Sequence, residues 1–459
     1  MSEYIELGIG ELEKLVGRVL SPYVMLITGN PGSGKTTLAS TICYKNALSD
    51  RKCLYVTFYE QKESFFRYMK NLGMDFESAG SKGLLSFIRV PVVSNIDAFV
   101  EALTSLISSN SYRIVVIDSI NPLFEILESR SRRAWLTNFF YNLAQVINGL
   151  VVLVAELPYG LETSSATEFV ADAVIVLKQS IEDGFLVRFM EIRKARGIPV
   201  TLAEIPFFIE ENVGLRVWVP PVLSEVSPEG EELVFKCEAL RKAWTAIRRG
   251  EVIYVTYPPD CRYPDVVALI ALQFIIYGMK LLVVSYRYPP NVIEEILVSQ
   301  LVKYGVRESS ARELLRKYLK VVSINPFSYS VSQLVMKELE IINSEKSDVV
   351  AFHGIEVARA VSDSKTYIRE LFNEINYLKN RKIIVVRLSS HISDEVYRID
   401  SSLTDAVIRV SCEEGASRPP PATYLWRKMH EPHYITVDEI RGCAYELVKY
   451  LSQESAEGK

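Results

Sequence analysis

The sequence has few cysteines, few histidines and no excess of charge of one sign, and each shortage excludes a class of protein. Its 459 residues include 6 cysteines and 4 histidines. The cysteines show no C-x-x-C spacing, which argues against a zinc site, and a chain of this length does not need a disulfide framework. We therefore expect free buried thiols in a reducing cytoplasm at Cys43, Cys53, Cys237, Cys261, Cys412 and Cys443.

Long apolar runs and an overall basic charge are also missing. Apolar runs such as Ile114–Ile117 have the length of a strand, far short of the ~20 residues of a membrane span. The opening MSEYIELGIGELEKL is amphipathic and acidic, unlike a secretory signal. A formal net charge of −4 gives no global attraction to nucleic acid. Basic clusters at Arg130–Arg133 and Arg248-Arg249 are better interpreted as solvated helix faces. We expect a cytoplasmic protein without a membrane span or a nucleic-acid partner.

The chain instead contains short β-branched runs that alternate with amphipathic stretches. This order predicts an α/β fold with mostly parallel sheets and helices on both faces. The last two strands of the first half have no helix between them, so we expect an antiparallel extension there. In the first half we expect strands at Tyr23–Thr28, Cys53–Phe58, Leu84–Arg89, Ile114–Asp118, Leu150–Ala155, Ala173–Leu177 and Phe185–Ile192, and helices at Thr36–Leu48, Lys62–Leu72 and Asn95–Ser108.

The same order of elements recurs after a segment rich in proline and acidic residues, Pro220–Gly230. The clearest echo is Leu403–Val410, which repeats the pattern of Val170–Leu177. Two tandem copies of one α/β domain are therefore predicted, each a mostly parallel twisted sheet flanked by helices. We expect a first domain at residues 1–220, a linker at 221–235, a second domain at 236–452 and a disordered tail at 453–459.

A glycine-rich loop in the first copy matches G-x-x-x-x-G-K-[ST], between a buried strand and a helix. The glycines let backbone N–H groups turn inward around phosphates, at a helix N-terminus that favours negative charge. Lys35 is then expected to reach the β- and γ-phosphates, and the Thr36 hydroxyl to bind Mg²⁺. The motif predicts that ATP with Mg²⁺ binds at Gly29, Asn30, Pro31, Gly32, Ser33, Gly34, Lys35, Thr36 and Thr37.

Asp118 ends the buried run Arg113–Ser119 and is interpreted as the carboxylate of a Walker B strand. At the carboxyl edge of the sheet it can hold the Mg²⁺ shell beside the P-loop. The plainer alternative is an N-cap or turn aspartate. In the second copy His353 takes the equivalent place, where a neutral imidazole cannot replace a magnesium carboxylate. There the segment Thr256–Asp265 has no glycine, no lysine and three prolines, so we expect that this copy kept its fold and lost its site.

Several further motifs resemble one family, the RecA-fold P-loop ATPases, in particular their KaiC-like branch of archaea and bacteria. The likeness covers nearly all of the first copy, with Glu13 in place of the usual aspartate of the opening motif. We identify the chain as an archaeal-type member with a degenerate second domain. The motifs are Leu7–Leu15, Tyr55–Glu60, Leu72–Asp75, Lys194–Gly197, and Ala203–Ile209 with Gly214-Leu215.

The resemblance implies roles for residues outside the P-loop. Its second strand normally leads into two glutamates, one of which polarises the attacking water. Here Tyr59 takes the first position, so Glu60 is the candidate catalytic carboxylate, against the alternative of a solvated glutamate. Lys194 and Arg196 are expected to reach the γ-phosphate in a neighbouring subunit, against the alternative of a solvent-facing basic pair. The second copy has Lys428-Met429-His430-Glu431 there, interpreted as keeping the lysine and losing the arginine.

These features predict a KaiC-like ATPase that forms a homo-oligomeric ring, hexameric by the resemblance, whose nucleotide state drives partner binding or regulation. One alternative is an ATP-sensing scaffold without turnover, favoured by Tyr59. A second is a recombinase-like DNA-binding protein. It is disfavoured because the Pro158–Thr167 loop, between Glu156 and Asp172 near the sheet edge, is acidic and lacks lysine and arginine. A protein partner is possible at the second domain.

Overall fold

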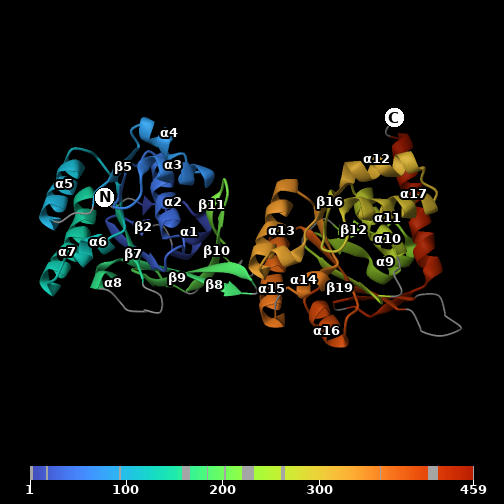
Figure 1. The fold of residues 1–459 in the computed structure, drawn as a ribbon. Coiled ribbons are helices and arrows are strands. Elements are labelled where there is room, and N and C mark those ends of the chain that lie inside the picture. The colour runs from blue at the N-terminus through green and yellow to red at the C-terminus, as the bar shows by residue number, and fades with distance from the viewer. Residues whose placement is uncertain are drawn as a thin grey trace. The chain divides into compact units, whose positions relative to one another are not determined.

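The computed structural model describes residues 4–16, 19–91, 95–157, 166–182, 184–200, 203–219, 232–259, 264–361, 363–411, 422–428 and 430–457. The chain divides into two compact units, Met1–Val219 and Pro220–Lys459. Each unit has its own sheet and its own hydrophobic core (Figure 1). None of the helices in the described ranges is long and apolar enough to cross a membrane.

The first unit is built around a nine-stranded sheet with the order β11-β10-β9-β8-β3-β7-β6-β4-β5. Strands β3 to β8 are parallel to their neighbours, and β9 to β11 extend the sheet antiparallel, as the missing helix predicts. The elements are β1 (Tyr4–Ile5), α1 (Gly10–Val16), β2 (Val19–Leu20), β3 (Tyr23–Gly29), α2 (Lys35–Leu48), β4 (Cys53–Thr57), α3 (Lys62–Asn71), α4 (Phe76–Ser81), β5 (Leu85–Arg89), α5 (Ile96–Ser108), β6 (Ile114–Asp118), α6 (Asn121–Glu125), α7 (Arg130–Ile147), β7 (Leu150–Glu156), α8 (Ala166–Val170), β8 (Ala173–Glu182), β9 (Phe185–Ala195), β10 (Glu204–Glu210) and β11 (Gly214–Val217).

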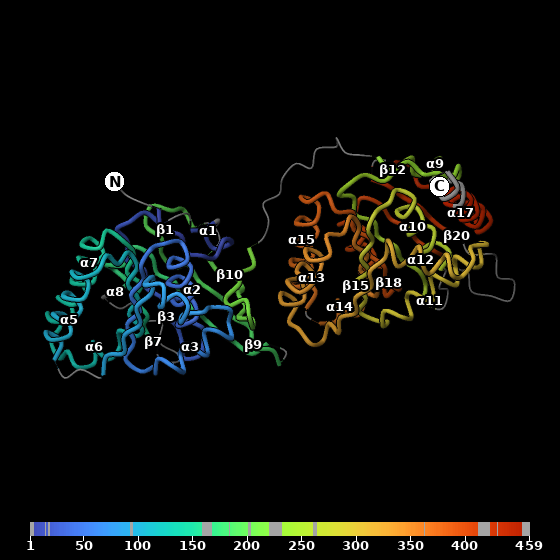
Figure 2. The backbone as a smooth tube through the Cα atoms, turned by 90° about the horizontal axis from the view of Figure 1, so that it is seen from above, coloured from blue at the N-terminus to red at the C-terminus, as the bar shows by residue number. Residues whose placement is uncertain are grey.

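The central strands are apolar throughout because helices cover both faces of the sheet. Every residue of β3 is buried, for example. Helices α1 to α4 pack on one face with one core cluster, and α5 to α7 pack on the other with a second. Figures 1 and 2 show α5 and α7 on one side of the strands and α2 and α3 on the other. The loops at the carboxyl ends of the parallel strands therefore converge at one edge, where ligands bind in such sheets.

The second unit repeats this topology with the order β16-β15-β17-β18-β14-β19-β20-β21. Read from β5, the strands of the first sheet follow the order β5-β4-β6-β7-β3-β8-β9-β10, and each has a counterpart at the same place in the second sheet. This correspondence confirms two tandem α/β domains. The elements are β12 (Glu232–Val234), α9 (Glu238–Trp244), β13 (Ala246–Arg248), β14 (Val252–Tyr257), α10 (Pro264–Ile276), β15 (Leu281–Ser285), α11 (Pro290–Lys303), α12 (Glu308–Tyr318), β16 (Leu319–Ser323), η1 (Pro326–Ser328), α13 (Val331–Glu345), β17 (Val349–His353), α14 (Ile355–Arg359), α15 (Ser364–Asn380), β18 (Ile384–Ser390), α16 (Asp394–Ser402), β19 (Ala406–Ser411), β20 (Ala422–Arg427), β21 (His433–Ile435) and α17 (Val437–Glu457).

The boundaries of the second unit differ from those expected. Strand β12 falls within the expected linker, because it pairs with β13 and buries Leu233 in the core of the second unit. Helix α17 continues to Glu457, into the expected tail. Residues 220–231 and 458–459 lie outside the described residues.

The expectation of free thiols is wrong for four cysteines. Cys43 of α2 and Cys53 of β4 form a disulfide with Cα atoms 5.7 Å apart, since the turn after α2 returns the chain beside that helix. Cys237 and Cys443 form a second one between α9 and α17, 206 residues apart in sequence. Neither pairing has a spacing signature, because both result from helix packing. Cys261 and Cys412 lie outside the described residues.

Two buried carboxylates meet between α13 and α15. Glu338 and Glu374 share a hydrogen bond, and the Tyr286 hydroxyl donates to Glu338 Oε1 at 2.6 Å. Burial raises the pKa of Glu374 to about 7, although the hydrogen bond with Glu338 and the charge of Arg387 oppose this rise. Burial and the Glu374 charge also raise the pKa of Glu338 well above its ordinary value. Both groups therefore resist ionisation in the folded protein.

We expect Glu374→Gln to stabilise the protein above pH 7. Because the folded pKa is raised, the folded state holds a proton that the unfolded state releases, so stability falls as pH rises from about 4.5 through 7. An uncharged amide removes this cost, and the free energy of unfolding at pH 8 should rise on the order of 1–3 kcal/mol. Urea unfolding at pH 5 and pH 8 measures this. Glu340→Gln on the exposed side of α13 should show no such pH-dependent gain, and an equal gain there would contradict the assignment.

Candidate functional site

The glycine-rich loop joins β3 to α2 at the carboxyl edge of the first sheet. Gly29 ends β3 between β7 and β8, and its neighbours across the sheet are Glu156 and Leu177. Gly29 has φ +151°, and a Cβ there would lie 2.1 Å from the Leu177 carbonyl oxygen. Gly34 has φ +101°, and a Cβ there would lie 2.8 Å from Ile209 Cδ1. Larger residues at these two positions would displace the loop from the sheet.

Hydrogen bonds hold the loop in a preformed turn. The Asn30 carbonyl accepts from the Ser33 N–H at 3.2 Å and from Lys35 Nζ at 2.8 Å. The Pro31 carbonyl accepts from Gln179 Nε2 at 3.0 Å, and Gly32 beside it is exposed. The buried Thr37 carbonyl accepts from the Thr41 hydroxyl inside α2. Among the described residues the buried Ser33 hydroxyl has no hydrogen-bond partner. Buried polar groups are normally hydrogen-bonded, so this hydroxyl is free to bind a ligand.

Lys35 is almost fully buried under this loop, with 4% of its side chain exposed, and its ammonium lies 3.3 Å from Glu156 Oε1. Burial lowers the pKa of Lys35, while the charges of Glu156 and Asp118 oppose that shift. Glu156 ends β7 and is held in place by Asn121, whose Oδ1 accepts from the Glu156 N–H at 2.7 Å. The carboxylate of Glu156 is therefore paired with the Lys35 ammonium, the group that a bound phosphate would need as its own partner.

Asp118 ends β6, two strands from β3, and lies beside the start of α2. Its Oδ2 accepts from the Tyr55 hydroxyl at 2.7 Å, and the Thr36 side chain also forms a hydrogen bond with it. Burial raises the pKa of Asp118, and the hydrogen bonds with Tyr55 and Thr36 and the charge of Lys35 oppose this rise. A hydroxyl and a carboxylate in contact are hard oxygen ligands of the kind that Mg²⁺ prefers. Together with the unpartnered Ser33 hydroxyl, they fit a triphosphate with Mg²⁺.

Glu60 lies at the same edge, three residues after Thr57, the last residue of β4. Its N–H donates to the Thr57 hydroxyl at 3.4 Å, and its charge adds to the high pKa of the nearby Tyr55, which burial raises most. Tyr59, in the position of the missing glutamate, is 60% exposed. Of the two residues, Glu60 alone provides a carboxylate near Asp118.

Lys194 and Arg196 lie at the opposite edge of the sheet. Lys194 pairs with Val174 at the beginning of β8, and its Nζ donates to the carbonyls of Glu168 and Phe169. Arg196 forms an ion pair with Asp172 at 2.7 Å and remains 55% exposed. Burial lowers the pKa of Lys194, as does the charge of Arg196. Since the P-loop is at the other end of these strands, this pair cannot contact the P-loop of its own domain.

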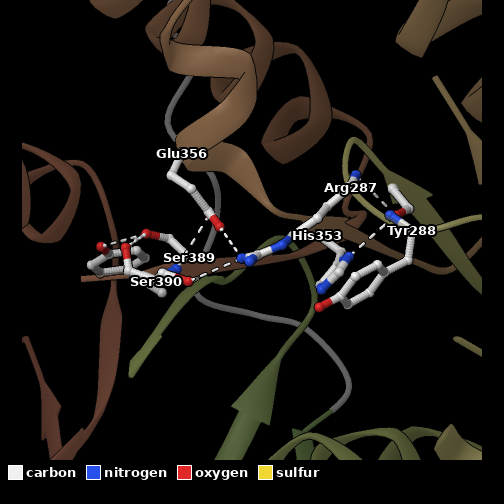
Figure 3. Close-up of polar contacts among 8 residues, drawn as sticks. Arg287, Tyr288, His353, Glu356, Ser389 and Ser390 are labelled. Atoms are coloured by element: carbon white, nitrogen blue, oxygen red, sulfur yellow. Dashed lines mark hydrogen bonds and ion pairs between the residues drawn. The ribbon is translucent and has the colours of Figure 1, made fainter. Parts of the chain in front are cut away.

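The second domain carries different side chains at each equivalent position. Strand pairing aligns Tyr257 with Gly29, His353 with Asp118, and Ser390 with Glu156. Figure 3 shows the resulting network at this edge: Arg287 contacts Glu356 at 3.0 Å and Ser390 at 3.3 Å. The His353 Nδ1 lies 3.2 Å from the Ser285 hydroxyl, as expected of a structural histidine. Among the described residues, His353 rather than a carboxylate stands where Asp118 stands in the first domain, and the sequence of the segment that replaces the glycine-rich loop, part of which lies outside the described residues, contains no lysine.

The expected match of Lys428 with Lys194 is wrong. The Lys428 N–H donates to the Asp405 carbonyl, as the Arg196 N–H does to the Asp172 carbonyl. Lys428 therefore aligns with Arg196, and Trp426, which pairs with Val407, aligns with Lys194. Matching by residue type therefore placed Lys428 two positions away from Trp426, the residue that strand pairing aligns with Lys194.

Three contacts of the site were not predicted from the sequence. Glu156 was placed near the sheet edge but not against Lys35, and Tyr55 and Gln179 were not singled out. A tyrosine in the middle of a fully buried strand is a signal, because its hydroxyl needs a partner inside the protein. The sequence has no comparable signal for Glu156 and Gln179. Their contacts with the glycine-rich loop form only when β7 and β8 lie beside β3 in the sheet.

Comparison with known proteins identifies the family. Residues 5–221 match the family of KaiC ATPases. The circadian clock protein KaiC3 of Synechocystis is 22% identical over 377 residues, which cover 78% of this chain and 73% of that protein. The circadian clock oscillator protein KaiC of Picosynechococcus is 28% identical over 46% of this chain, but the match covers only 43% of that relative. The archaeal flagellar ATP-binding protein FlaH of Sulfolobus acidocaldarius is 24% identical over 48% of this chain and 98% of its own length.

The family match covers the whole first domain, including the glycine-rich loop, Asp118 and the strand that carries Lys194. The loop, the buried lysine and the hydroxyl–carboxylate pair have the arrangement that the motif predicts. Residues 5–221 are therefore a KaiC-family ATPase domain of the RecA-fold P-loop type.

Proposed function

We propose that the first domain binds ATP with Mg²⁺ and hydrolyses it to ADP and phosphate, in a ring of identical chains. The observation that carries this proposal is the contact between Thr36 and Asp118 beneath the loop that presents Lys35. These groups bring together a phosphate cradle, a cation and two oxygen ligands. When bound, Mg²⁺ would neutralise negative charge on the β- and γ-phosphate oxygens.

Each protein group has a separate task in the proposed reaction. Lys35 leaves Glu156 and contacts the β- and γ-phosphate oxygens, and the backbone N–H groups of Gly32 to Thr36 surround the phosphates. A water molecule attacks the γ-phosphorus, and Glu60 accepts its proton as the bond to the β–γ bridging oxygen breaks. Lys194 and Arg196 of a neighbouring subunit offset the charge on the transferred phosphoryl group.

Glu60→Gln should separate hydrolysis from binding. Without a carboxylate to accept the proton, kcat is expected to fall about 10²-fold or more, while the dissociation constant for ATP changes little. Steady-state phosphate release and equilibrium binding of a fluorescent ATP analogue measure the two quantities. Glu156→Gln is the matched carboxylate variant. Because Glu156 competes for Lys35, its loss should tighten ATP binding about 2- to 5-fold with kcat nearly unchanged. An equal loss of kcat in both variants would contradict the assignment.

A scaffold that binds ATP without turnover is the second candidate. The observation in its favour is Tyr59, an exposed side chain at the position of the usual first glutamate. If phosphate release by the wild type equals that of Lys35→Ala while ATP still binds, this function replaces the first. A DNA-binding function has less support, because the expected contact loop, Pro158–Thr167, is acidic and lacks lysine and arginine. A salt-dependent shift of single-stranded DNA on a gel would support it.

A ring explains why Lys194 and Arg196 lie away from their own P-loop. In a head-to-tail ring, each interface joins the P-loop edge of one domain to the opposite edge of the next. A hexamer is the proposed state, and its nucleotide state would control the binding of a protein partner. Sedimentation with and without ATP tests the assembly.

A further inference from the structure

The second domain contains a cavity of about 470 Å³ between α10, α11 and the sheet. Its lining from these elements is almost entirely apolar, with Val267, Phe274, Val283 and Ile293 among the described residues that form it. The polar side chains of the described lining come from the carboxyl edge of the sheet: Tyr257 ends β14 and His353 ends β17, and Tyr288 lies beside His353 (Figure 3). The cavity is therefore apolar along its length and polar at one end.

The cavity lies where smaller side chains replace aromatic rings of the first domain. There Tyr55, Phe65 and Phe87 pack together on the sheet, with ring centroids 4.7 to 5.7 Å apart. Strand pairing and the loop after β15 align Tyr55 and Phe65 with Val283 and Ile293, which both line the cavity. The missing rings leave space on the face of the sheet that α10 and α11 cover.

The side chains at these positions are also more exposed to solvent in the second domain than in the first. Tyr55 and Phe65 are 0% and 1% exposed, whereas Val283 and Ile293 are 6% and 9% exposed. A packed core leaves few voids larger than a water molecule, so this space is not an ordinary packing defect. Its volume falls in the range of small-molecule sites, about 300–1,000 Å³.

We propose that the second domain binds a small, uncharged, apolar molecule in this cavity, with one hydroxyl or carbonyl group at the end near Tyr288 and His353. Tyrosine hydroxyls and imidazoles can each donate and accept hydrogen bonds, whereas the walls offer only dispersion contacts. An apolar ligand would gain free energy by removing these walls from water. The chain that follows β14, with prolines and with Tyr257 in place of Gly29, cannot cradle phosphates, so a nucleotide is excluded as the occupant.

The charges nearby are consistent with an uncharged ligand. Arg287, the cation at this edge beside Tyr288, is paired with Glu356 at 3.0 Å, so its charge is already neutralised within the protein. Polar atoms are confined to one end of the cavity, and a charged group placed deeper would lack any partner.

Titration of the full chain with the uncharged fluorophore N-phenyl-1-naphthylamine tests the proposal. We expect a saturable rise in fluorescence with one probe per chain. Val283→Phe and Val292→Phe place a ring in the cavity and should weaken probe binding at least tenfold. Val302→Phe makes the same change on α11 at an exposed position outside the cavity lining and should bind the probe as the wild type does.

Controls separate this site from the ATP site and from misfolding. Lys35→Ala should keep full probe binding, and the two cavity variants should keep ATP binding and a cooperative thermal transition. If Val283→Phe does not fold, the half-buried Val292 position decides the question. The absence of saturable probe binding by the wild type, or undiminished binding by a folded cavity variant, would overturn the proposal.

Competition tests the polar end of the cavity. 1-Naphthol is expected to displace the probe at a lower concentration than naphthalene, because only 1-naphthol has a hydroxyl group for Tyr288 and His353. Equal potency of the two compounds would overturn the assignment of a polar end.

Discussion

Lys35→Ala is expected to reduce kcat/KM for ATP on the order of 10³-fold or more, to the background of phosphate release. A hydrogen bond to a charged group contributes about 1.5–3 kcal/mol to binding, and loss of one preorganised donor to the transferred phosphoryl costs a further ~10²-fold or more. The side chain is almost fully buried beside the loop, so no other lysine can take its place. Phosphate release and ATP binding at constant salt measure the two parts of the effect.

Lys45→Ala is the matched control, because Lys45 lies on the exposed last turn of the same helix. It should retain the rate of the wild type. Loss of activity in both variants would indicate damage to α2 rather than loss of a phosphate contact, and full activity of Lys35→Ala would contradict the proposed reaction.

Arg196→Ala is expected to lower kcat about 10³-fold while ATP binding is preserved, because an arginine supplied by a neighbour acts mainly on the transition state. Arg196 is half-exposed, but its partner Asp172 is buried and would keep the Val24 N–H as a donor, so the substitution should cost the domain about 1–3 kcal/mol of stability. Arg193→Ala, on the same strand, removes a surface arginine that pairs with Glu191 and should leave kcat unchanged.

Mixing two inactive variants shows whether Arg196 acts at the ATP site of a neighbouring subunit or at the ATP site of its own subunit. In an equal mixture of Lys35→Ala and Arg196→Ala chains, about a quarter of the interfaces in a ring combine an intact lysine with an intact arginine. Recovery of about that fraction of the wild-type rate is expected. A mixture that remains inactive would contradict completion of the site between subunits.

The sequence was sufficient for the parts of this molecule that depend on local patterns. The buried run of β3, the glycines after it and the helix that follows have a fixed spacing, so the loop and its strand could be placed residue by residue. Asp118 could be predicted because parallel strands end at a common edge. The second domain could be predicted because its elements recur along the chain in the order of the first.

Features that depend on contacts between distant elements could not be predicted. The carboxylate of Glu156 meets Lys35 only when β7 lies beside β3, and the Cys237–Cys443 bond requires α9 and α17 to pack together. A cavity is a difference in volume, and no periodic pattern changes when Tyr55 and Phe65 are replaced by Val283 and Ile293. The alignment of Lys428 with Arg196 follows from strand pairing, which the residue types alone do not reveal.

The separation of Lys35 and Arg196 at opposite edges of one sheet makes mass action part of the proposed chemistry. An isolated chain holds both halves of the site and can use neither, so turnover per chain should rise with chain concentration until the ring is fully assembled. Dilution then acts as an inhibitor that needs no ligand. Any molecule that separates the subunits would stop ATP consumption without approaching a phosphate.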